Sequence, residues 1–304
     1  MKPAAPPVRS SRLLLRWYSR HARPLPWRAT RNPYRVLVSE IMLQQTQVQR
    51  VLEAYPRFLR TFRSFPGLAR ASRRSVIVAW RGMGYNNRAV RLHRLAQILV
   101  RSRGAKLPHD EKALLRLPGV GPYTARAILV FAFGKRAAAV DINVRRVLSR
   151  LVWRMPSTAS LRNLEEVRTV ADSLVPRGRA YDWNQALMDL GATVCTAHAP
   201  RCSICPLSRV CLSRPSMREV AARRIRREPS MDGVPNRLYR GKIVETLRGS
   251  RRPIPLPHIG RAIHAGFAAR HERWLQRIID RLAHDGIVRV RGNGSFRSRM
   301  VSLV

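Results

Sequence analysis

Acidic residues are scarce in this sequence. Its 304 residues include 17 aspartates and glutamates against 59 lysines and arginines, giving a formal net charge of +42 and a pI near 11.9. Nearly all the cations are arginine; a GC-rich genome would favour arginine codons, but such a bias does not explain the shortage of acids. The excess of positive charge predicts a polyanionic partner and binding that weakens steeply with salt. A membrane surface is the competing polyanion, but no basic amphipathic segment has a clear aromatic face, so the composition favours nucleic acid.

Long hydrophobic segments are also missing. The longest apolar run that stands out is AILVFAFG at 127–134. It is too short to cross a bilayer, which takes about 20 residues, and is typical of a buried helix. The N-terminal stretch is basic and rich in proline, and the leucines at 13–15 are too few for the hydrophobic part of a secretory signal. We therefore expect a cytoplasmic protein of the bacterial cytosol or nucleoid, with reduced thiols.

Cysteine occurs only four times, always within one short stretch, at Cys195, Cys202, Cys205 and Cys211. Two disulfides would suit a small secreted domain, but this chain is long enough to bury a hydrophobic core without them. Zinc sites usually take their cysteines from two close pairs, whereas here only Cys202 and Cys205 form one. A single loop that supplies four thiolates favours an iron–sulfur cluster, with zinc as the alternative.

The spacing of apolar residues predicts an all-α body over residues 12–212, between a disordered arm at 1–11 and a basic linker at 213–235. The Asn-Pro pair at 32–33 is a helix start signal, because proline suits the first helical position and asparagine suits the cap before it. We expect one central helix over residues 34–59. No internal repeat is visible.

Residues 236–304 form a second, smaller unit. Their apolar periodicity predicts amphipathic helices at 236–249 and 272–286 and a shorter helix near 258–266. The segments IVRV and MVSLV, separated by the turn RGNGS, predict a two-stranded hairpin. Three helices and a hairpin form the layout of a winged-helix domain, which would either add DNA contacts or pack against another domain or a partner.

Glu40 stands out because it and Glu53 are the only acidic residues among the first 109. It lies in VLVSEIML, where most neighbours are apolar, so its carboxylate should lose hydration. Such a loss raises the pKa toward values useful for proton transfer. A helix glutamate paired with one of the many arginines would give the same pattern without any catalytic role.

The segment LLRLPGVGPYTARA at 114–127 predicts a second functional feature. Two helical stretches flank a turn that contains Gly119, Val120 and Gly121, and its glycines permit positive φ and close approach of the backbone. The helix that follows directs free N–H groups outward, which suits a DNA phosphate. An ordinary turn between helices is the structural alternative.

Asp141 precedes another helix, in AAAVDINVRRVLSRL, with Asn143 in the first helical turn. A simple N-cap explains this aspartate. A capping carboxylate also faces the open space in front of the helix, so capping is compatible with a role toward a ligand.

These segments together resemble the helix–hairpin–helix base-excision glycosylases, and most closely the MutY-type adenine DNA glycosylases. The resemblance covers about residues 12–212, in order, and includes the cysteine loop together with LPWR at 25–28, SEIMLQQTQV at 39–48, GMGY at 82–85, LPGVGPYTA at 117–125, VDINVRRVL at 140–148 and NQALMDLGATVC at 184–195. It implies a four-iron, four-sulfur cluster on the four cysteines, which in this family folds a small domain against DNA and does not perform base chemistry.

The resemblance also implies roles for single residues. Glu40 matches the glutamate that protonates adenine N7 and helps to activate water, and Asp141 matches the aspartate that stabilises the developing sugar cation. Tyr123 and Asn143 match supporting residues around this pair. Endonuclease III-type enzymes instead have a nucleophilic lysine at the position of Tyr123, so the resemblance implies a monofunctional glycosylase.

Gln45 and Tyr85 match residues that insert into the base stack while the target base is extruded. Asn86 follows Tyr85, where a second tyrosine is common in MutY. Residues 236–304 do not resemble the Nudix-related C-terminal domain that recognises 8-oxoguanine in MutY enzymes, so that specificity does not follow from the resemblance.

The expected function is therefore excision of adenine mispaired with guanine or 8-oxoguanine, as part of base excision DNA repair. A thymine or uracil mismatch glycosylase is the alternative, since FGKRAAAVD at 133–141 is somewhat like theirs. A non-catalytic DNA-binding protein is a third hypothesis. We expect a monomer that binds double-stranded DNA containing a mismatched or damaged base pair.

Overall fold

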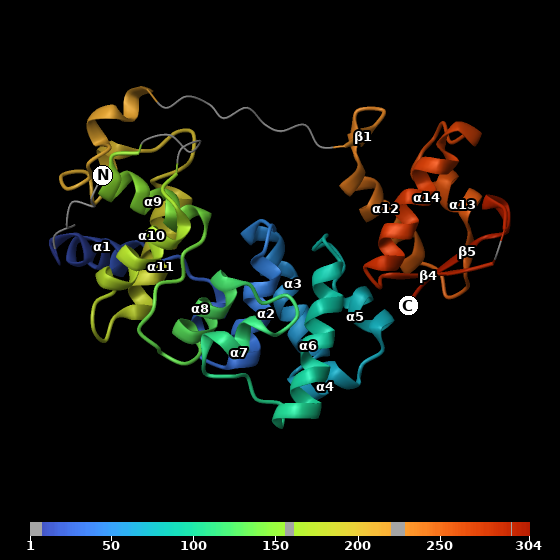
Figure 1. Ribbon diagram of the computed structural model, residues 1–304, viewed down its shortest axis with the longest axis horizontal. Coiled ribbons are helices and arrows are strands. Elements are labelled where there is room, and N and C mark those ends of the chain that lie inside the picture. Colours follow the sequence, from blue (N-terminus) through green and yellow to red (C-terminus); the bar gives the residue numbers. More distant parts are fainter. Residues whose placement is uncertain (1–7, 156–160, 220–228, 293) are drawn as a thin grey trace. The chain divides into compact units, whose positions relative to one another are not determined.

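Helices make up most of the chain in the computed structural model, in agreement with the predicted mainly α fold (Figure 1). The structure describes residues 8–155, 161–219, 229–292 and 294–304. The chain divides into two compact units, formed by residues 1–40 with 108–225 and by residues 41–107 with 226–304.

The first unit has a core built on α8, α9 and α11. Its helical segments are α1 (Val8–His21), η1 (Pro26–Ala29), α2 (Pro33–Leu43, whose last residues belong to the second unit), α7 (Glu111–Leu115), α8 (Pro122–Phe131), α9 (Ile142–Trp153), α10 (Leu164–Leu174), α11 (Ala180–Thr193), η2 (Cys202–Ile204) and η3 (Arg214–Glu219). The apolar run at 127–134 supplies the end of α8, where residues 127–131 are all buried, as predicted for a helix inside a core.

The second unit combines a helical half with the C-terminal part of the chain. Its helical segments are α3 (Val48–Thr61), α4 (Phe65–Arg70), α5 (Arg73–Ala79), α6 (Asn87–Arg103), α12 (Asn236–Arg248), α13 (Leu256–Ile263), η4 (Ala269–His271), α14 (Glu272–His284) and η5 (Phe296–Ser298). Its strands are β1 (Ser230–Met231), β2 (Val234–Pro235), β3 (Ile254–Pro255), β4 (Val288–Arg291) and β5 (Met300–Leu303).

The C-terminal part of this unit has the predicted winged-helix-like layout. Strands β4 and β5 form the expected antiparallel hairpin, with Val290 opposite Val301. The two-residue strand β3 joins the outer side of β5, which gives a three-stranded sheet in the order β3-β5-β4. No period-2 pattern can reveal so short a strand, so the sequence predicted only the hairpin.

The single helix expected over residues 34–59 is wrong. The Asn-Pro start is confirmed, because Asn32 Oδ1 accepts a hydrogen bond from the Arg35 amide at 3.1 Å and Pro33 is the first helical residue. The helix ends at Leu43, however, and α3 starts at Val48. Gln45 between them has a φ of 56°, which is incompatible with a continuous right-handed helix.

The segments predicted as a disordered arm and as a linker both contain some regular secondary structure. Helix α1 begins at Val8, so the end of the stretch expected as an arm is helical, and residues 1–7 lie outside the described residues. Within 213–235, η3 and the short β1–β2 hairpin are formed, whereas residues 220–228 are not among those described. Across the part of the chain that the structure describes, the search for a helix long and apolar enough to span a membrane finds none.

A buried ion pair fixes the N-terminal segment to α11. Both oxygens of Asp189, which is fully buried, accept hydrogen bonds at 2.8 Å from the Arg28 guanidinium, and Arg23 Nε donates to Asp189 Oδ1 at 2.6 Å. Burial alone would raise the pKa of Asp189, but the hydrogen bonds and charges of Arg28 and Arg23 hold it below its ordinary value. The carboxylate therefore stays charged inside the unit.

Replacing Asp189 by Asn should destabilise the protein strongly, because it leaves the Arg28 guanidinium, only 9% exposed, without its counter-charge. We expect a loss of about 3–5 kcal/mol in the free energy of unfolding, measured by urea denaturation. Asp182→Asn on the same helix is the matched control: its partner Arg179 is exposed, so the loss should stay below about 1 kcal/mol. Equal losses in the two variants would contradict the assignment.

Candidate active site

Glu40 is the buried acid that its sequence context predicts. It lies on α2 within an unbroken run of buried residues, 36–42, and is only 5% exposed. Burial, followed by the negative charge of Asp141, raises its pKa from 4.5 to about 7, against opposing contributions from a Tyr123 hydrogen bond and the Arg28 charge. Among the described residues, Glu40 Oε2 has no hydrogen-bond partner. One oxygen of this carboxyl group is thus buried without a hydrogen bond.

Tyr123 lies in the first turn of α8, where its hydroxyl donates a hydrogen bond to Met188 Sδ at 3.9 Å, and it contributes to the pKa shift of Glu40. The helix begins with Gly121 as its cap and Pro122 at its first position, which places Tyr123 at the start of the helix. Burial, then the charges of Glu40 and Asp141, raises the pKa of Tyr123 well above 10. The phenol therefore remains protonated and able to donate a hydrogen bond.

Asp141 is the N-cap of α9, as its sequence position predicts. Its Oδ1 accepts a hydrogen bond from the Val144 amide at 2.7 Å, and its Oδ2 accepts one from Asn143 Nδ2 at 2.9 Å. Asn143 is itself held, because its Oδ1 accepts a hydrogen bond from Arg146 at 3.0 Å. A Cβ atom on Gly191 of α11 would lie only 3.0 Å from that of Asn143, so this site requires close packing of the two helices.

The structure brings the four residues with predicted catalytic roles into one connected set within the first unit. Tyr123 and the charge of Asp141 both act on the pKa of Glu40, and Asn143 donates a hydrogen bond to Asp141. Their roles in catalysis stay predictions.

The sequence did not predict that Arg28 belongs to the candidate active site. Arg28 lies in the LPWR segment that contributes to the family resemblance, but the resemblance implied no role for it. The structure shows that its charge acts on both Glu40 and Tyr123 while its guanidinium binds Asp189. An isolated aspartate in the apolar helix 184–195 was the available signal, since a buried carboxylate needs a cationic partner.

The hairpin between α7 and α8 has the backbone that its glycines predict. Gly119 has a φ of 82°, in the left-handed region that favours glycine. Val120 is buried and its amide bonds back to the carbonyl of Leu117 at 3.2 Å. Gly121 has open space where a Cβ would lie, so the backbone in front of α8 is accessible to a close-approaching group.

Gln45 and Tyr85, the residues predicted to insert into the base stack, belong to the second unit. Both are exposed, and both have left-handed backbones, with φ values of 56° and 42°. Such values are uncommon outside glycine and cost free energy, which surrounding contacts must offset. In each loop the backbone is tightly bent at this residue, and the side chain of the residue is exposed.

One buried guanidinium holds both loops. Arg88 on α6 is 6% exposed, and burial lowers its pKa to about 10, which still leaves it charged at neutral pH. Its nitrogens donate hydrogen bonds of 2.5–3.4 Å to the carbonyls of Ile41, Met42, Gln44, Met83, Gly84 and Tyr85 and to the hydroxyl of Thr46. A planar cation with five donors is the side chain best suited to bind so many carbonyls at once.

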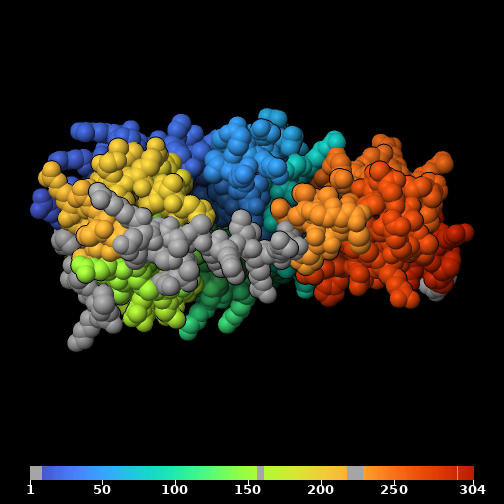
Figure 2. Space-filling view, turned by 90° about the horizontal axis from the view of Figure 1, so that it is seen from above, coloured from blue at the N-terminus to red at the C-terminus, as the bar shows by residue number. Residues whose placement is uncertain are grey.

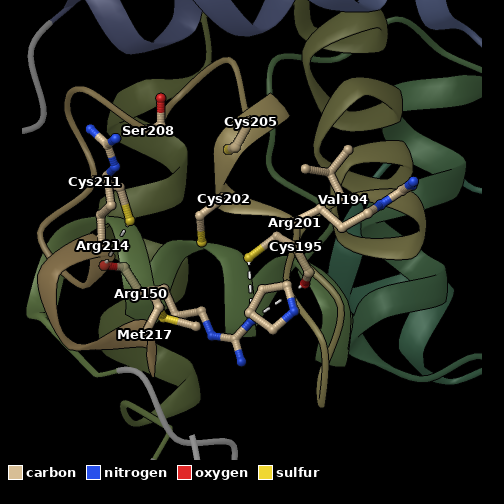
Figure 3. Close-up of a pocket in the computed structure, with 11 residues that line it drawn as sticks. Arg150, Val194, Cys195, Arg201, Cys202, Cys205, Ser208, Cys211, Arg214 and Met217 are labelled. Carbon is tan, nitrogen blue, oxygen red and sulfur yellow. Dashed lines mark hydrogen bonds between the residues drawn. The ribbon is translucent and has the colours of Figure 1, made fainter. Parts of the chain in front are cut away.

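The four cysteines face a shared cavity in the first unit (Figure 3). All lie in the described part of the chain and line the cavity together with Arg150, Arg201 and Arg214. Four thiol groups around one cavity can bind a metal ion or a metal cluster.

Two arginines of α9 surround this cysteine loop. Arg150, fully buried, donates a hydrogen bond to Cys195 Sγ at 3.4 Å and to the carbonyls of Thr196 and Ala197 at 2.7 and 3.1 Å. Arg146 donates to the Cys195 carbonyl at 2.9 Å. The donors and positive charge of these side chains suit anionic thiolates.

A second set of potential ligands lies in the second unit. One oxygen of Asp232 and one ring nitrogen each of His264 and His271 lie within 4.8 Å of one another. His264 Nε2 and Asp232 Oδ2 are already hydrogen-bonded at 2.7 Å, and the Arg270 guanidinium donates to His271. A neighbouring cation disfavours a metal ion, so we interpret this group as a hydrogen-bonded cluster that fastens the β1–β2 turn.

Comparison with known proteins identifies relatives of the whole chain. Residues 38–168 match the HhH-GPD superfamily of base excision DNA repair proteins. The adenine DNA glycosylase of Mycolicibacterium smegmatis is 39% identical over 287 residues, which cover 93% of this chain and 94% of that protein. That of Mycobacterium tuberculosis H37Rv is 39% identical over 251 residues, 79% of each chain.

A solved structure titled as a thermostable thymine-DNA glycosylase is also similar, with a TM-score of 0.63 and 32% identity over 68% of this chain and 95% of that chain. The match to the M. smegmatis protein covers so much of the chain that it includes most of residues 236–304. The C-terminal part is therefore shared with that relative.

Replacing Glu40 by Gln should stabilise the protein above neutral pH. A carboxyl group whose folded pKa is raised from 4.5 to about 7 favours folding at low pH, and this contribution is lost as the pH rises through that interval. The variant should therefore gain up to about 3 kcal/mol over the natural protein at pH 8 and much less at pH 4.5. Urea denaturation at both pH values measures the difference. The exposed Glu53→Gln is the control, and a gain independent of pH would contradict the assignment.

Proposed function

The chain belongs to the HhH-GPD superfamily of base excision DNA repair proteins and, within it, to the MutY-type adenine DNA glycosylases, and we propose that it hydrolyses the N-glycosidic bond of adenine mispaired with guanine or 8-oxoguanine. As a DNA N-glycosylase it binds DNA, which agrees with its net charge of +42. The mispair and the roles of single residues are the parts that we propose.

The observation that carries this proposal is the buried Glu40 carboxyl, whose pKa is raised by burial and by the charge of a second carboxylate, Asp141. Breaking an N-glycosidic bond requires a proton on the leaving base and negative charge near the sugar, which becomes oxocarbenium-like. A pKa of about 7 keeps a substantial part of the Glu40 groups protonated at neutral pH. Two acids of different environment can therefore divide the two tasks.

In the proposed reaction, protonated Glu40 donates its proton to N7 of the extruded adenine. The electrons of the glycosidic bond then leave with the base, and the Asp141 carboxylate stabilises the positive charge that develops on the sugar. Glu40, now ionised, accepts a proton from the water that attacks C1′. Asn143 donates a hydrogen bond to one oxygen of Asp141, and Tyr123 is proposed to orient Glu40 when the base is bound.

Tyr123 also supports the assignment as a monofunctional enzyme. Strand cleavage by a bifunctional glycosylase needs an amine nucleophile that forms a Schiff base with C1′. A protonated phenol cannot form that intermediate. We propose that the product is an intact strand with an abasic site.

Gln45 and Tyr85 are proposed to fill the space that the extruded base leaves. Extrusion costs a few kcal/mol in lost stacking and pairing. An exposed aromatic ring regains part of this cost by stacking on the neighbouring bases. Tyr85 is 45% exposed, so its ring is accessible to stacked bases. The hairpin formed by Gly119, Val120 and Gly121 is proposed to bind a DNA phosphate, with the phosphate approaching the open space at Gly121.

The four cysteines, Cys195, Cys202, Cys205 and Cys211, are proposed to hold a four-iron, four-sulfur cluster. When bound, such a group would supply structural cross-linking of the loop 195–211 and no step in base excision. The single loop that supplies all four thiolates and the Arg150 donor at Cys195 support a multi-iron anionic group.

The second candidate function is excision of thymine or uracil from mismatches with guanine. It is favoured by the similarity to the structure named as a thymine-DNA glycosylase, at 32% identity. Relatives named as adenine DNA glycosylases match at higher identity and over more of the chain, so adenine remains our first choice.

Single-turnover cleavage of duplexes containing A·8-oxoG, A·G, T·G or U·G decides between these substrates. We expect adenine to be released from the first two duplexes, with strand breaks only after alkali because no Schiff base forms. Glu40→Gln should abolish excision while duplex affinity stays within about twofold, since the exchange removes the acid and leaves the DNA contacts. Release of thymine or uracil alone would support the alternative, and tight binding without release would support a non-catalytic protein.

Freshly purified protein should be coloured, with broad absorption at about 400 nm and about four iron atoms per chain, as expected for a ferric–sulfide cluster. Cys202→Ser should lose most of the absorption. Ser208→Ala is the matched control, because Ser208 lines the same cavity without offering a thiolate. Colourless protein with one zinc ion per chain would contradict the cluster.

A further inference from the structure

Within the second unit, helix α12 of the C-terminal part is joined to the loop that contains Tyr85. We propose that the C-terminal domain, residues 236–304, acts in base extrusion by bracing this loop, and that Arg248 is the positioning residue through which it does so. The inference rests on the proposed function of Tyr85 as the residue that enters the base stack. It assigns the C-terminal domain a role that needs no direct contact with DNA.

Arg248 is the last residue of α12, and its side chain is 9% exposed. Its Nη2 donates hydrogen bonds to the Ile77 carbonyl at 2.9 Å and to Asn86 Oδ1 at 2.8 Å, while its Nε donates to the Ile77 carbonyl at 3.3 Å. Both partners lie far away in the sequence, on either side of the loop. A charged donor to neutral acceptors in a buried place gives a stronger contact than a neutral one.

Asn86 directly follows Tyr85 and occupies the cap position of α6. Asparagine at that position usually binds an amide of the first helical turn, yet the Asn86 side chain makes no such bond. Asn86 is 8% exposed, and its oxygen accepts the hydrogen bond of Arg248 instead. The side chain is therefore used to connect the two parts of the unit.

The contact between Arg248 and Ile77 also lies in a buried region. Ile77 lies near the C-terminal end of α5, where helix carbonyls lack intrahelical partners and attract a cation. Its fully buried side chain belongs to the apolar core that Tyr239, Ile243 and Leu247 of the C-terminal part form. Figures 1 and 2 show the C-terminal segment directly beside the segment that contains α5.

The geometry of Arg248 is fixed by charges around it. Glu245, one turn earlier on α12, accepts a hydrogen bond from Arg248 Nη1 at 2.9 Å and is also paired with Arg81, which precedes the loop. At the other end of α5, Arg74 donates to the Ser250 carbonyl at 2.7 Å. The contact surface therefore extends along the whole of α5.

The loop needs such support because its backbone is unfavourable. Gly82, Gly84 and Tyr85 all have positive φ, and tyrosine rarely adopts that conformation. A ring that pushes into stacked bases must also resist being pushed back. Arg88 holds the carbonyls of the loop from one side, and Arg248 holds the residue after Tyr85 from the C-terminal domain.

The test compares full-length Arg248→Met with Arg240→Met. Arg240 lies on the same helix and loses an ion pair with Asp285 inside the C-terminal domain, without contact to the loop. Extrusion is measured by the fluorescence rise of 2-aminopurine placed 5′ to the mispaired adenine, and excision by single-turnover kinetics. We expect Arg248→Met to slow both by about tenfold, because small displacements of a positioned group cost that much or more, while Arg240→Met stays within twofold.

Two further comparisons separate bracing from a general loss of fold. Thermal midpoints of the two variants should be similar, and Asn86→Ala should reduce extrusion to a similar extent as Arg248→Met. The double variant should be no slower than either single one, because one contact is removed once. Wild-type extrusion rates in Arg248→Met, or additive effects in the double variant, would overturn the proposal. Failure of the unmodified protein to excise adenine would instead overturn the proposed function, and the extrusion comparison would then be repeated on the base that it does excise.

Discussion

Buried guanidinium groups binding backbone carbonyls are the interaction on which this structure depends. Loops normally remain at the surface because their carbonyls need water. Here arginine side chains, instead of water, donate hydrogen bonds to the carbonyls of bent backbone segments. Arg88 bonds to the loops around Gln45 and Tyr85, Arg150 to the cysteine loop, and Arg248 to the end of α5. The arginine excess therefore contributes to folding as well as to attraction of DNA.

Buried arginines also connect the candidate active site to the cysteine loop. Helix α9 begins at Asp141 and reaches the cysteine loop through Arg146 and Arg150, so a single rigid element joins the proposed sugar-stabilising carboxylate to the proposed cluster. Tight packing at Gly191 fixes Asn143 from the neighbouring helix. The cysteine loop and the candidate active site are therefore connected through one helix.

Features of the candidate active site could be predicted from the sequence where they depend only on a residue's immediate neighbours in the chain. The apolar context of Glu40 implied its burial, and the position of Asp141 before a helix implied its cap. The break at Gln45 could not be foreseen, because the apolar period continues through it and the cause is Arg88, some forty residues away. The long-range partners of Arg28 and Arg248 could not be identified from the local sequence. The isolated Asp189 in an apolar stretch indicated only that a cationic partner was needed.

The near absence of lysine has a consequence for how the protein meets a changing environment. A buried ammonium readily gives up its proton, whereas a guanidinium keeps it throughout the physiological range. The interior scaffold of this protein therefore holds constant charge when the acidity of the cell varies. Glu40, with a pKa of about 7, can then change its charge within this range while the guanidinium groups around it keep theirs.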